Sequence, residues 1–176
     1  MRAKDKGGAL PRGAPLPLSG PFLTIPRGLL MSIAERLRSC GAGVRECVVY
    51  IAASLDVPAS GPREVVASYH PTHEASATHY NVPLGEMWRM SDALYRDRQQ
   101  IAGQFHTHPG VAFHSNADNE GLFLPVPGYL SIVVPRFAEA GLSSFRGCYA
   151  TWYVGGGCWE KIPQPDIAAR IRVDEC

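Results

Sequence analysis

The sequence predicts one α/β (mixed) domain, in which a central mixed β-sheet is flanked by helices. A chain of 176 residues that is 45% hydrophobic can bury about 70% of its unfolded surface in a single core. Segments with helical spacing of apolar residues alternate along the chain with short β-branched runs. We find no internal repeat of roughly 20 to 50 residues, which argues against a solenoid.

Residues 1–22 are predicted to form a flexible Pro/Gly-rich N-terminal tail, either mobile or used as a docking arm. They are rich in glycine, proline and charge. Such a segment cannot bury enough surface to offset the entropy lost when it becomes ordered. The folded domain is therefore expected to occupy residues 23–176.

A helix and a β-hairpin are predicted to open this domain. The helix begins near Pro26 and ends at Gly41. Its apolar side chains share one face: Leu29, Leu30, Ile33 and Leu37. The apolar run 46–53 is typical of a buried strand, and a turn over 58–62 leads to a second strand over 64–69. These two strands would pair as a hairpin.

The second half of the chain is predicted to add a helix and several strands. A helix over 85–99 would cover one face of the sheet with a broad apolar surface. That surface comprises Leu84, Met87, Trp88, Met90, Ser91, Leu94 and Tyr95. Further strands are expected at 101–105, 129–134, 145–154 and 158–162. Residues 165–173 fit either a last helix or an edge strand.

Composition excludes several classes of function. The 17 basic and 16 acidic residues are scattered, without the basic stripe that follows a phosphate backbone, so nucleic acid is not an expected partner. No apolar run approaches the roughly 20 residues of a membrane span and no secretory signal is present, so we expect a cytoplasmic protein with no membrane partner. The five cysteines are an odd number without Cys-x-x-Cys spacing, which favours reduced thiols over disulfides or a structural zinc site.

Two histidines and an aspartate form a candidate zinc site. His106 and His108 stand at the end of a predicted strand, where side chains at i and i+2 point to the same face. Asp118 follows in the next segment. Two nitrogen ligands and one oxygen ligand can bind a catalytic zinc and leave the fourth position for water, which the metal activates for attack on an amide. We therefore expect one Zn²⁺ ion per chain.

The same residues resemble the signature of the JAMM, or MPN+, zinc metalloproteases, also called JAB proteases. That family carries a distant Glu, then His-Ser/Thr-His-Pro, then Ser-x-x-Asp. This chain has His106-Thr107-His108-Pro109 followed by Ser115-x-x-Asp118. The resemblance covers roughly residues 26 to 162 and implies the MPN/JAB1 cytidine-deaminase-like fold. It also implies that His106, His108 and Asp118 bind zinc and that Ser115 helps to hold the oxyanion.

Glu46 is the residue that the resemblance identifies as general base. The family Glu opens the first strand after an N-terminal helix, in a pattern like Glu-x-x-Gly-x-Leu-x-Gly. Glu46-x-x-Val49-x-Ile51-x-Ala53 occupies the matching place, with both glycines replaced. In this role Glu46 takes a proton from the attacking water and later passes it to the leaving amine. Glu64 and Glu74 are alternative bases, but they lie in the hairpin segment after the first strand.

The sequence around the motif is particularly similar to the deubiquitinase-like JAB proteases of bacterial ubiquitin-like conjugation operons, including those linked to antiphage defence. The similarity rests on residues 106–110, on His114-Ser115 and on residues 127–135. It implies an isopeptidase that cleaves after the C-terminal tail of a ubiquitin-like protein. E1-like and E2-like enzymes of the same operon would be further partners.

Three alternative functions can be weighed against this one. Catalytically inactive MPN-type scaffolds typically lack a ligand, whereas this chain has the complete set. A nucleobase deaminase would need His-x-Glu and Pro-Cys-x-x-Cys, and neither occurs. A protease that trims a sulfur-carrier or ubiquitin-like precursor to its Gly-Gly end cannot be separated by sequence from one that dismantles conjugates.

The other histidines and the tryptophans are given no definite site role. His70, His73 and His79 suggest a second metal site, but Pro71 argues against a helix and their order is not His-Glu-x-x-His, so we interpret them as exposed hairpin or loop residues. His114 would either orient the leaving group or line the groove. Trp88, Trp152 and Trp159 are expected to pack in the core or the groove.

Overall fold

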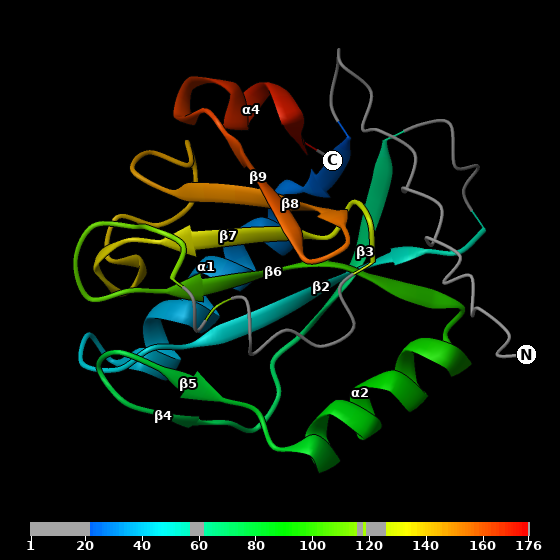
Figure 1. The fold of residues 1–176 in the computed structure, drawn as a ribbon, viewed down its shortest axis with the longest axis horizontal. Coiled ribbons are helices and arrows are strands. Elements are labelled where there is room, and N and C mark those ends of the chain that lie inside the picture. Colours follow the sequence, from blue (N-terminus) through cyan, green and yellow to red (C-terminus); the bar gives the residue numbers. More distant parts are fainter. Residues whose placement is uncertain (1–21, 57–61, 116–117, 119–125, 176) are drawn as a thin grey trace, which may run out of the picture.

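An eight-stranded mixed sheet forms the centre of the protein, whose computed structural model describes residues 22–56, 62–115, 118 and 126–175. The strand order is β10-β1-β3-β2-β6-β7-β8-β9, and β4 and β5 form a separate two-stranded sheet (Figure 1). The strands are β1 Leu23–Pro26, β2 Val48–Ser54, β3 Arg63–Tyr69, β4 Glu74–Ala75, β5 Tyr80–Asn81, β6 Gln99–Thr107, β7 Leu130–Val134, β8 Tyr149–Gly155, β9 Cys158–Ile162 and β10 Ile171–Asp174. The helices are α1 Arg27–Gly41, α2 Leu84–Arg96 and α4 Ile167–Arg170, with short 3-10 turns at Arg136–Ala138 and Gln164–Asp166.

The pairing of the strands confirms the predicted mixed sheet and the predicted hairpin. β2 runs antiparallel to both β3 and β6, and β7, β8 and β9 form an antiparallel series. β6 and β7 are parallel neighbours. β1 is parallel to both β10 and β3. Parallel neighbours cannot be joined by a tight hairpin, so β6 and β7 are related by a crossover connection.

Helix α1 covers one face of the sheet, behind it in the view of Figure 1. Pro26 precedes the helix with φ −56°, which is pre-set for a first turn. The buried helix residues Leu30, Ile33 and Leu37 pack in one cluster with alternate side chains of β2. The helix ends at Gly41 as predicted, although the left-handed residue that terminates it is Ala42, with φ 47°.

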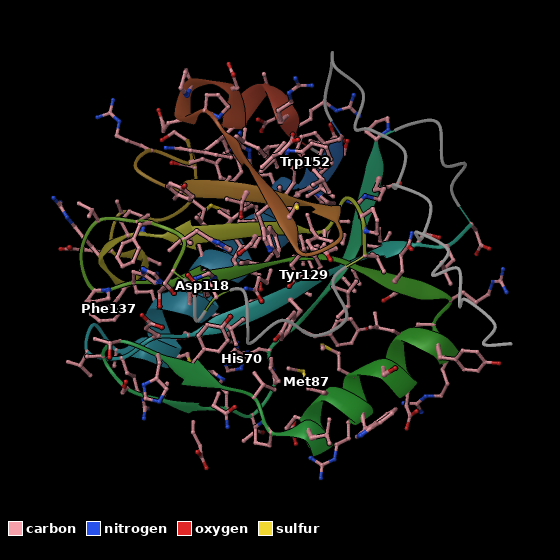
Figure 2. The ribbon with its side chains drawn as sticks, viewed as in Figure 1. His70, Met87, Asp118, Tyr129, Phe137 and Trp152 are labelled. Atoms are coloured by element: carbon pink, nitrogen blue, oxygen red, sulfur yellow. The ribbon has the colours of Figure 1, made fainter. Side chains whose placement is uncertain are left out.

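Helix α2 covers the opposite face, and its buried side is narrower than the sequence predicted. Met87, Met90 and Leu94 pack against the other face of β2, and Met87 points from the helix towards the sheet (Figure 2). The expectation that Leu84, Trp88 and Tyr95 join this surface is wrong: they are 68%, 62% and 85% exposed. One helical stripe faces the sheet, and these three residues lie outside it. The helix ends at Arg96, before the predicted limit, because Arg98 adopts φ 52° and turns the chain into β6.

A β-bulge in β6 sets which side chains face each layer. The register with β2 shifts between Ile51 and Ala52, so β6 carries an extra residue there. Ala102 and Phe105 consequently both pack in the α1 cluster, although they are three residues apart. Beyond the bulge the strand alternates regularly, so Gln104 and His106 lie on the face opposite to Phe105.

Several short elements were not predicted. β1 is four residues long, and two-residue strands such as β4 and β5 carry no periodic signal. The segment 165–173, for which a helix and an edge strand were alternatives, contains α4 followed by β10. Phe22 is buried and its N–H donates to the carbonyl of Arg170, whereas the rest of the predicted tail lies outside the described residues. Within the described ranges, no helix combines the length and apolar character of a membrane span.

Candidate metal centre

Strand β6 delivers two imidazoles to one place at its C-terminal end. His106 is the second-last residue of the strand and His108 follows the strand directly, so the two side chains share a face. The end of the strand is fixed on both sides by backbone hydrogen bonds. The Thr107 N–H donates to the Cys47 carbonyl at 3.0 Å, and the His108 N–H donates to the Val134 carbonyl at 3.0 Å. The carboxyl ends of the parallel strands β6 and β7 therefore frame the site.

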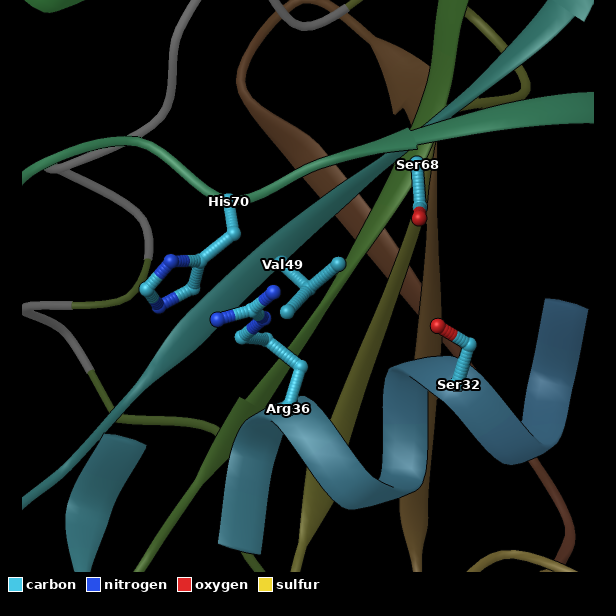
Figure 3. Close-up of a pocket in the computed structure, with 5 residues that line it drawn as sticks. All are labelled: Ser32, Arg36, Val49, Ser68 and His70. Atoms are coloured by element: carbon cyan, nitrogen blue, oxygen red, sulfur yellow. The ribbon is translucent and has the colours of Figure 1, made fainter. Parts of the chain in front are cut away.

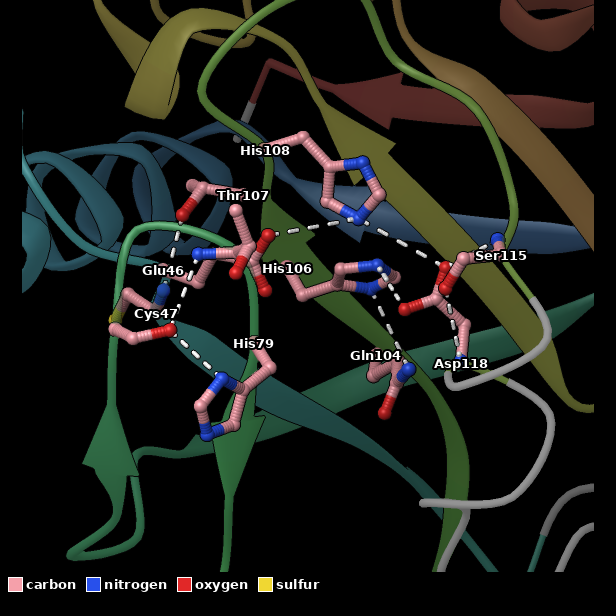
Figure 4. A network of polar contacts seen from close by, with 11 residues as sticks. Glu46, Cys47, His79, Gln104, His106, Thr107, His108, Ser115 and Asp118 are labelled. Carbon is pink, nitrogen blue, oxygen red and sulfur yellow. Dashed lines mark hydrogen bonds and ion pairs between the residues drawn. The ribbon is translucent and has the colours of Figure 1, made fainter.

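Asp118 completes a compact group of three ligand atoms (Figure 4). Its Oδ1 lies 3.1 Å from His106 Nε2, and its Oδ2 lies 3.8 Å from His108 Nε2. One ligand atom from each of the three residues lies within 4.8 Å of the others. Nitrogen and oxygen ligands at about 2.0–2.1 Å from a tetrahedral zinc are separated by about 3.3 Å, so this spacing suits one ion.

Burial leaves one atom of this group without a partner among the described residues. His106 is 0% exposed, and its Nε2 makes no hydrogen bond to that part of the chain. The carboxylate oxygen 3.1 Å away lies within range, but the geometry is not that of a hydrogen bond. A buried polar atom without a partner is costly unless an ion or water satisfies it. The donor set and this orphaned nitrogen both fit a bound zinc ion.

Gln104 is placed to orient the His106 ring. Its amide nitrogen lies 3.4 Å from His106 Nδ1, whereas its buried Oε1 has no partner in the described ranges. Turning the amide over would bring Oε1 to His106 Nδ1, which could then donate a hydrogen bond. That arrangement satisfies the orphaned oxygen and leaves the Nε2 lone pair available to a metal.

The charge states of these groups are those that metal binding requires. Burial by itself raises the pKa of Asp118, but the adjacent His106 and His108 imidazoles and the hydrogen bond from the Ser115 N–H outweigh it and hold the pKa well below its usual range. Burial lowers the pKa of His106, which keeps the imidazole neutral. An ionised carboxylate and a neutral imidazole are the ligand forms of these side chains.

Ser115 and Asp118 bind each other in a reciprocal arrangement. The Ser115 N–H donates to Asp118 Oδ2 at 2.6 Å, and the Asp118 N–H donates to Ser115 Oγ at 3.2 Å. This is the pattern of a capping box, so the Ser-x-x-Asp spacing has a structural function as well. Because Ser115 Oγ accepts in this pair, its hydroxyl hydrogen stays available to donate to another group.

Glu46 stands beside the ligands at the start of β2. It is 3% exposed, and its Oε1 lies 3.9 Å from His108 Nε2. Its N–H donates to the Ser76 carbonyl at 2.8 Å. Burial raises the pKa of Glu46 to about 7; the Asp118 charge adds to the increase and His108 opposes it. Glu64 and Glu74, the alternative bases, are exposed on β3 and β4.

Two aromatic contacts flank the centre. The Phe113 ring lies 4.9 Å from the His108 ring and is 52% exposed. The His114 ring packs 5.1 Å from Trp159, and its buried Nε2 has no partner among the residues described. This position suits either role predicted for His114, orienting a leaving group or lining a groove.

Sequence reasoning missed the residues that support the ligands. Thr107 Oγ1 accepts a hydrogen bond from the Cys47 N–H at 2.9 Å, which ties the ligand strand to the residue after Glu46. The Tyr80 ring lies 5.6 Å from the His106 ring. Gln104 could have been found, because it precedes His106 by two residues on a strand and therefore shares its face.

Comparison with known proteins gives a sequence relative and several similar folds. No family model matches the sequence. The chain is 27% identical over 152 residues to the probable metalloprotease y4jG of Sinorhizobium fredii (strain NBRC 101917 / NGR234), covering 86% of this chain and 93% of that protein. The solution structure of protein DSY2949 from Desulfitobacterium hafniense has a TM-score of 0.61 at 16% identity, covering 88% of this chain and 94% of that one. A protein from Salinibacter ruber has a TM-score of 0.53 at 15% identity, covering 80% and 89% respectively.

Proposed function

We propose that this chain is a zinc-dependent peptidase of the JAMM type, with the MPN/JAB1 cytidine-deaminase-like fold, that cleaves after the C-terminal tail of a ubiquitin-like protein. The observation that carries the proposal is the convergence of His106, His108 and Asp118 within 4.8 Å, with Glu46 Oε1 3.9 Å from His108. Similarity to a protein named probable metalloprotease supports the peptidase class. The order of the motifs in the chain supports the JAMM type.

The ligand chemistry favours zinc. Two imidazole nitrogens and one carboxylate oxygen are the donors of catalytic zinc sites, whereas magnesium and calcium prefer oxygen ligands. A zinc ion held by these residues would lower the pKa of water towards about 7 and polarise a carbonyl oxygen. The orphaned Nε2 of His106 supports an ion at this position.

Glu46 and Ser115 supply the remaining chemistry of peptide hydrolysis. The Glu46 carboxylate takes a proton from the attacking water and delivers it to the leaving amine as the carbon–nitrogen bond breaks. The Ser115 hydroxyl, which is free to donate, stabilises the negative charge on the former carbonyl oxygen. Removing one donor of this kind typically costs about 2.7–4 kcal/mol of transition-state stabilisation.

The proposed substrate is an extended tail that ends in glycine. An extended peptide can add a strand beside a sheet, and narrow pockets then select small side chains. Exposed apolar side chains occur in the segment that follows His108: Phe113 is 52% exposed with its ring 4.9 Å from the His108 ring, and Val111 is 79% exposed. They offer apolar contact to the tail on its way to the centre.

Two uses of this activity differ in the group that is joined to the tail. An isopeptidase removes the ubiquitin-like protein from a lysine of a conjugate. This activity would serve a bacterial conjugation operon that encodes E1-like and E2-like enzymes, including an operon for antiphage defence. A processing protease trims a sulfur-carrier or ubiquitin-like precursor. An inactive scaffold of the same fold would bind such a tail without cutting it.

Zinc content and cleavage together test the proposal. Elemental analysis of the purified chain should find zinc that His108→Ala reduces. The protein should then be incubated with a ubiquitin-like protein of its own genome, extended by a short peptide or joined to a lysine side chain. We expect cleavage after the terminal glycine by wild type and by Glu64→Gln, a matched control at an exposed carboxylate, but not by Glu46→Gln. Zinc binding without cleavage of either substrate would support the scaffold, and absence of zinc would contradict the metallopeptidase.

A further inference from the structure

A second group of metal-ligating side chains lies outside the centre described above. Cys40, Cys47, His70 and His73 bring two sulfur atoms and two ring nitrogens within 4.8 Å of one another. They come from separate parts of the chain: the last turn of α1, the residue before β2, the residue after β3 and the loop before β4. The four residues are far apart in the sequence and include no Cys-x-x-Cys motif, so the sequence pattern did not indicate this group.

The distances match those expected around a tetrahedral ion. Cys40 Sγ lies 3.6 Å from His73 Nε2, and Cys47 Sγ lies 3.3 Å from His70 Nε2. Zinc–sulfur bonds of about 2.3 Å and zinc–nitrogen bonds of about 2.0–2.1 Å at a tetrahedral angle separate sulfur from nitrogen by about 3.6 Å. Two thiolates and two imidazoles are one of the common donor sets of structural zinc.

The imidazoles are oriented for this role. His73 Nδ1 lies 2.9 Å from the carbonyl of Pro71, which can only accept, so Nδ1 carries the proton and the Nε2 lone pair faces Cys40. A backbone carbonyl that fixes a histidine tautomer is the usual support of a metal ligand. His70 presents its Nε2 to the second sulfur, 3.3 Å from Cys47 Sγ.

The surroundings allow an ion to enter and balance its charge. A cavity of about 290 Å³ is lined by three of the four ligands, Cys40, His70 and His73. A neighbouring cavity of about 360 Å³ is lined by Arg36 and His70, and Arg36 extends from α1 towards β2 (Figure 3). Two thiolates neutralise a divalent cation, so the group needs no carboxylate.

We propose that Cys40, Cys47, His70 and His73 bind a structural zinc ion, separate from the centre formed by His106, His108 and Asp118. Four protein ligands close the coordination shell and leave no position for water, which is the property of a structural site. This inference replaces the expectations of a single zinc per chain, of uncoordinated thiols and of histidines without a metal. It does not depend on the proposed peptidase activity.

The ion would fix the segment that carries the general base. Cys47 follows Glu46 in the chain, and His70 and His73 lie on either side of the turn that leads to β4. The Tyr80 ring stands between the two groups, 6.4 Å from the His73 ring and 5.6 Å from the His106 ring. A bound ion would therefore lock α1, β2 and β3 together beside the catalytic residues.

The alternative is a metal-free pair of thiol–imidazole contacts. In that state the Cys47 thiol would keep its proton and donate it to His70 Nε2, which lies 3.3 Å away. A bound zinc would deprotonate it outright. Cobalt(II) distinguishes these states, because only cobalt bound to thiolate sulfur gives a sulfur-to-metal charge-transfer absorption, and the set of His106, His108 and Asp118 contains no sulfur.

The test uses the full chain, stripped of metal under reducing conditions and reloaded with cobalt(II) or zinc. We expect wild type to show a sulfur-to-cobalt absorption. Asp118→Ala and the exposed-thiol control Cys158→Ser should retain this absorption, and the double variant Cys40→Ser/Cys47→Ser should lose it. Zinc should protect Cys40 and Cys47 from alkylation, relative to Cys158, until a chelator is added. Lack of the absorption in wild type, its persistence in the double variant, or alkylation of Cys40 at the same rate with and without zinc would overturn the proposal. The wild-type spectrum and the alkylation do not require the double variant to fold.

Discussion

Thr107 and Cys47 are joined by two hydrogen bonds in opposite directions. The Cys47 N–H donates to Thr107 Oγ1 at 2.9 Å, and the Thr107 N–H donates to the Cys47 carbonyl at 3.0 Å. Thr107 separates the two histidine ligands, and Cys47 follows the proposed base Glu46. This joint therefore sets the distance between the base and the ligands.

Replacing Thr107 by valine should test the joint with little change in shape. The variant loses the acceptor and leaves the Cys47 N–H buried without a partner, which typically costs about 1–3 kcal/mol of stability. Urea unfolding should show this loss, whereas Thr72→Val at an exposed position should change the free energy of unfolding by less than about 0.5 kcal/mol. Equal stability of the two variants would mean that the joint contributes nothing.

Ser115→Ala should separate metal binding from turnover. The ligands His106, His108 and Asp118 remain, so the zinc content should stay at the wild-type level. Loss of an oxyanion donor should reduce kcat by about 10²–10³-fold. The variant also loses the capping acceptor of the Asp118 N–H, so a decrease of about 1 kcal/mol in stability is expected. Wild-type turnover in this variant would refute the role of the hydroxyl.

Gln104→Leu should weaken metal binding without removing a ligand. The amide that orients the His106 ring is lost, and removing such a support typically lowers metal affinity by about 10–100-fold. Competition with a chromophoric chelator measures the metal affinity of the centre formed by His106, His108 and Asp118. Gln100→Leu, at an exposed position of the same strand, is the matched control and should retain the wild-type affinity. Identical affinities for both variants would show that Gln104 does not support the ligand.

The sequence was most informative where a local pattern coincides with a function. Strand β9 was predicted with its observed bounds, and His106 and His108 fall on one strand end, where the i, i+2 rule predicts a shared face. Their proximity to Glu46 could be expected only from the family resemblance, because it depends on the pairing of β2 with β6.

Features that depend on long-range contacts were not predictable in this way. The group of Cys40, Cys47, His70 and His73 forms only when α1, β2 and β3 are assembled, and each residue alone has an ordinary explanation. The helix α2 was predicted, but the predicted buried face is wider than the observed one. The sequence does not show how much of an apolar helix the sheet can cover.

Gly103 is a further residue whose importance becomes visible only in the folded sheet. A Cβ at this position would overlap the carbonyl of Leu130 on the neighbouring strand β7. The backbone of β7 cannot move aside as the end of a side chain can. Gly103→Ala should therefore destabilise the protein by about 1–3 kcal/mol, the cost typical of overpacking, or by more. The bulge beside it also aligns Gln104 and His106, so metal affinity should fall as well.

Gly28→Ala provides the matched control for this prediction. A Cβ on Gly28 would meet no atom of the described residues within 4 Å, and the residue lies in the first turn of α1. Alanine there should leave stability unchanged or raise it by up to about 1 kcal/mol, because glycine is unfavourable in a helix. Thermal and urea unfolding of both variants, with chelator competition for the metal, measure the effects. If Gly103→Ala were as stable as Gly28→Ala, the close approach of β6 and β7 at this point would be wrong, and with it the basis for the alignment of His106.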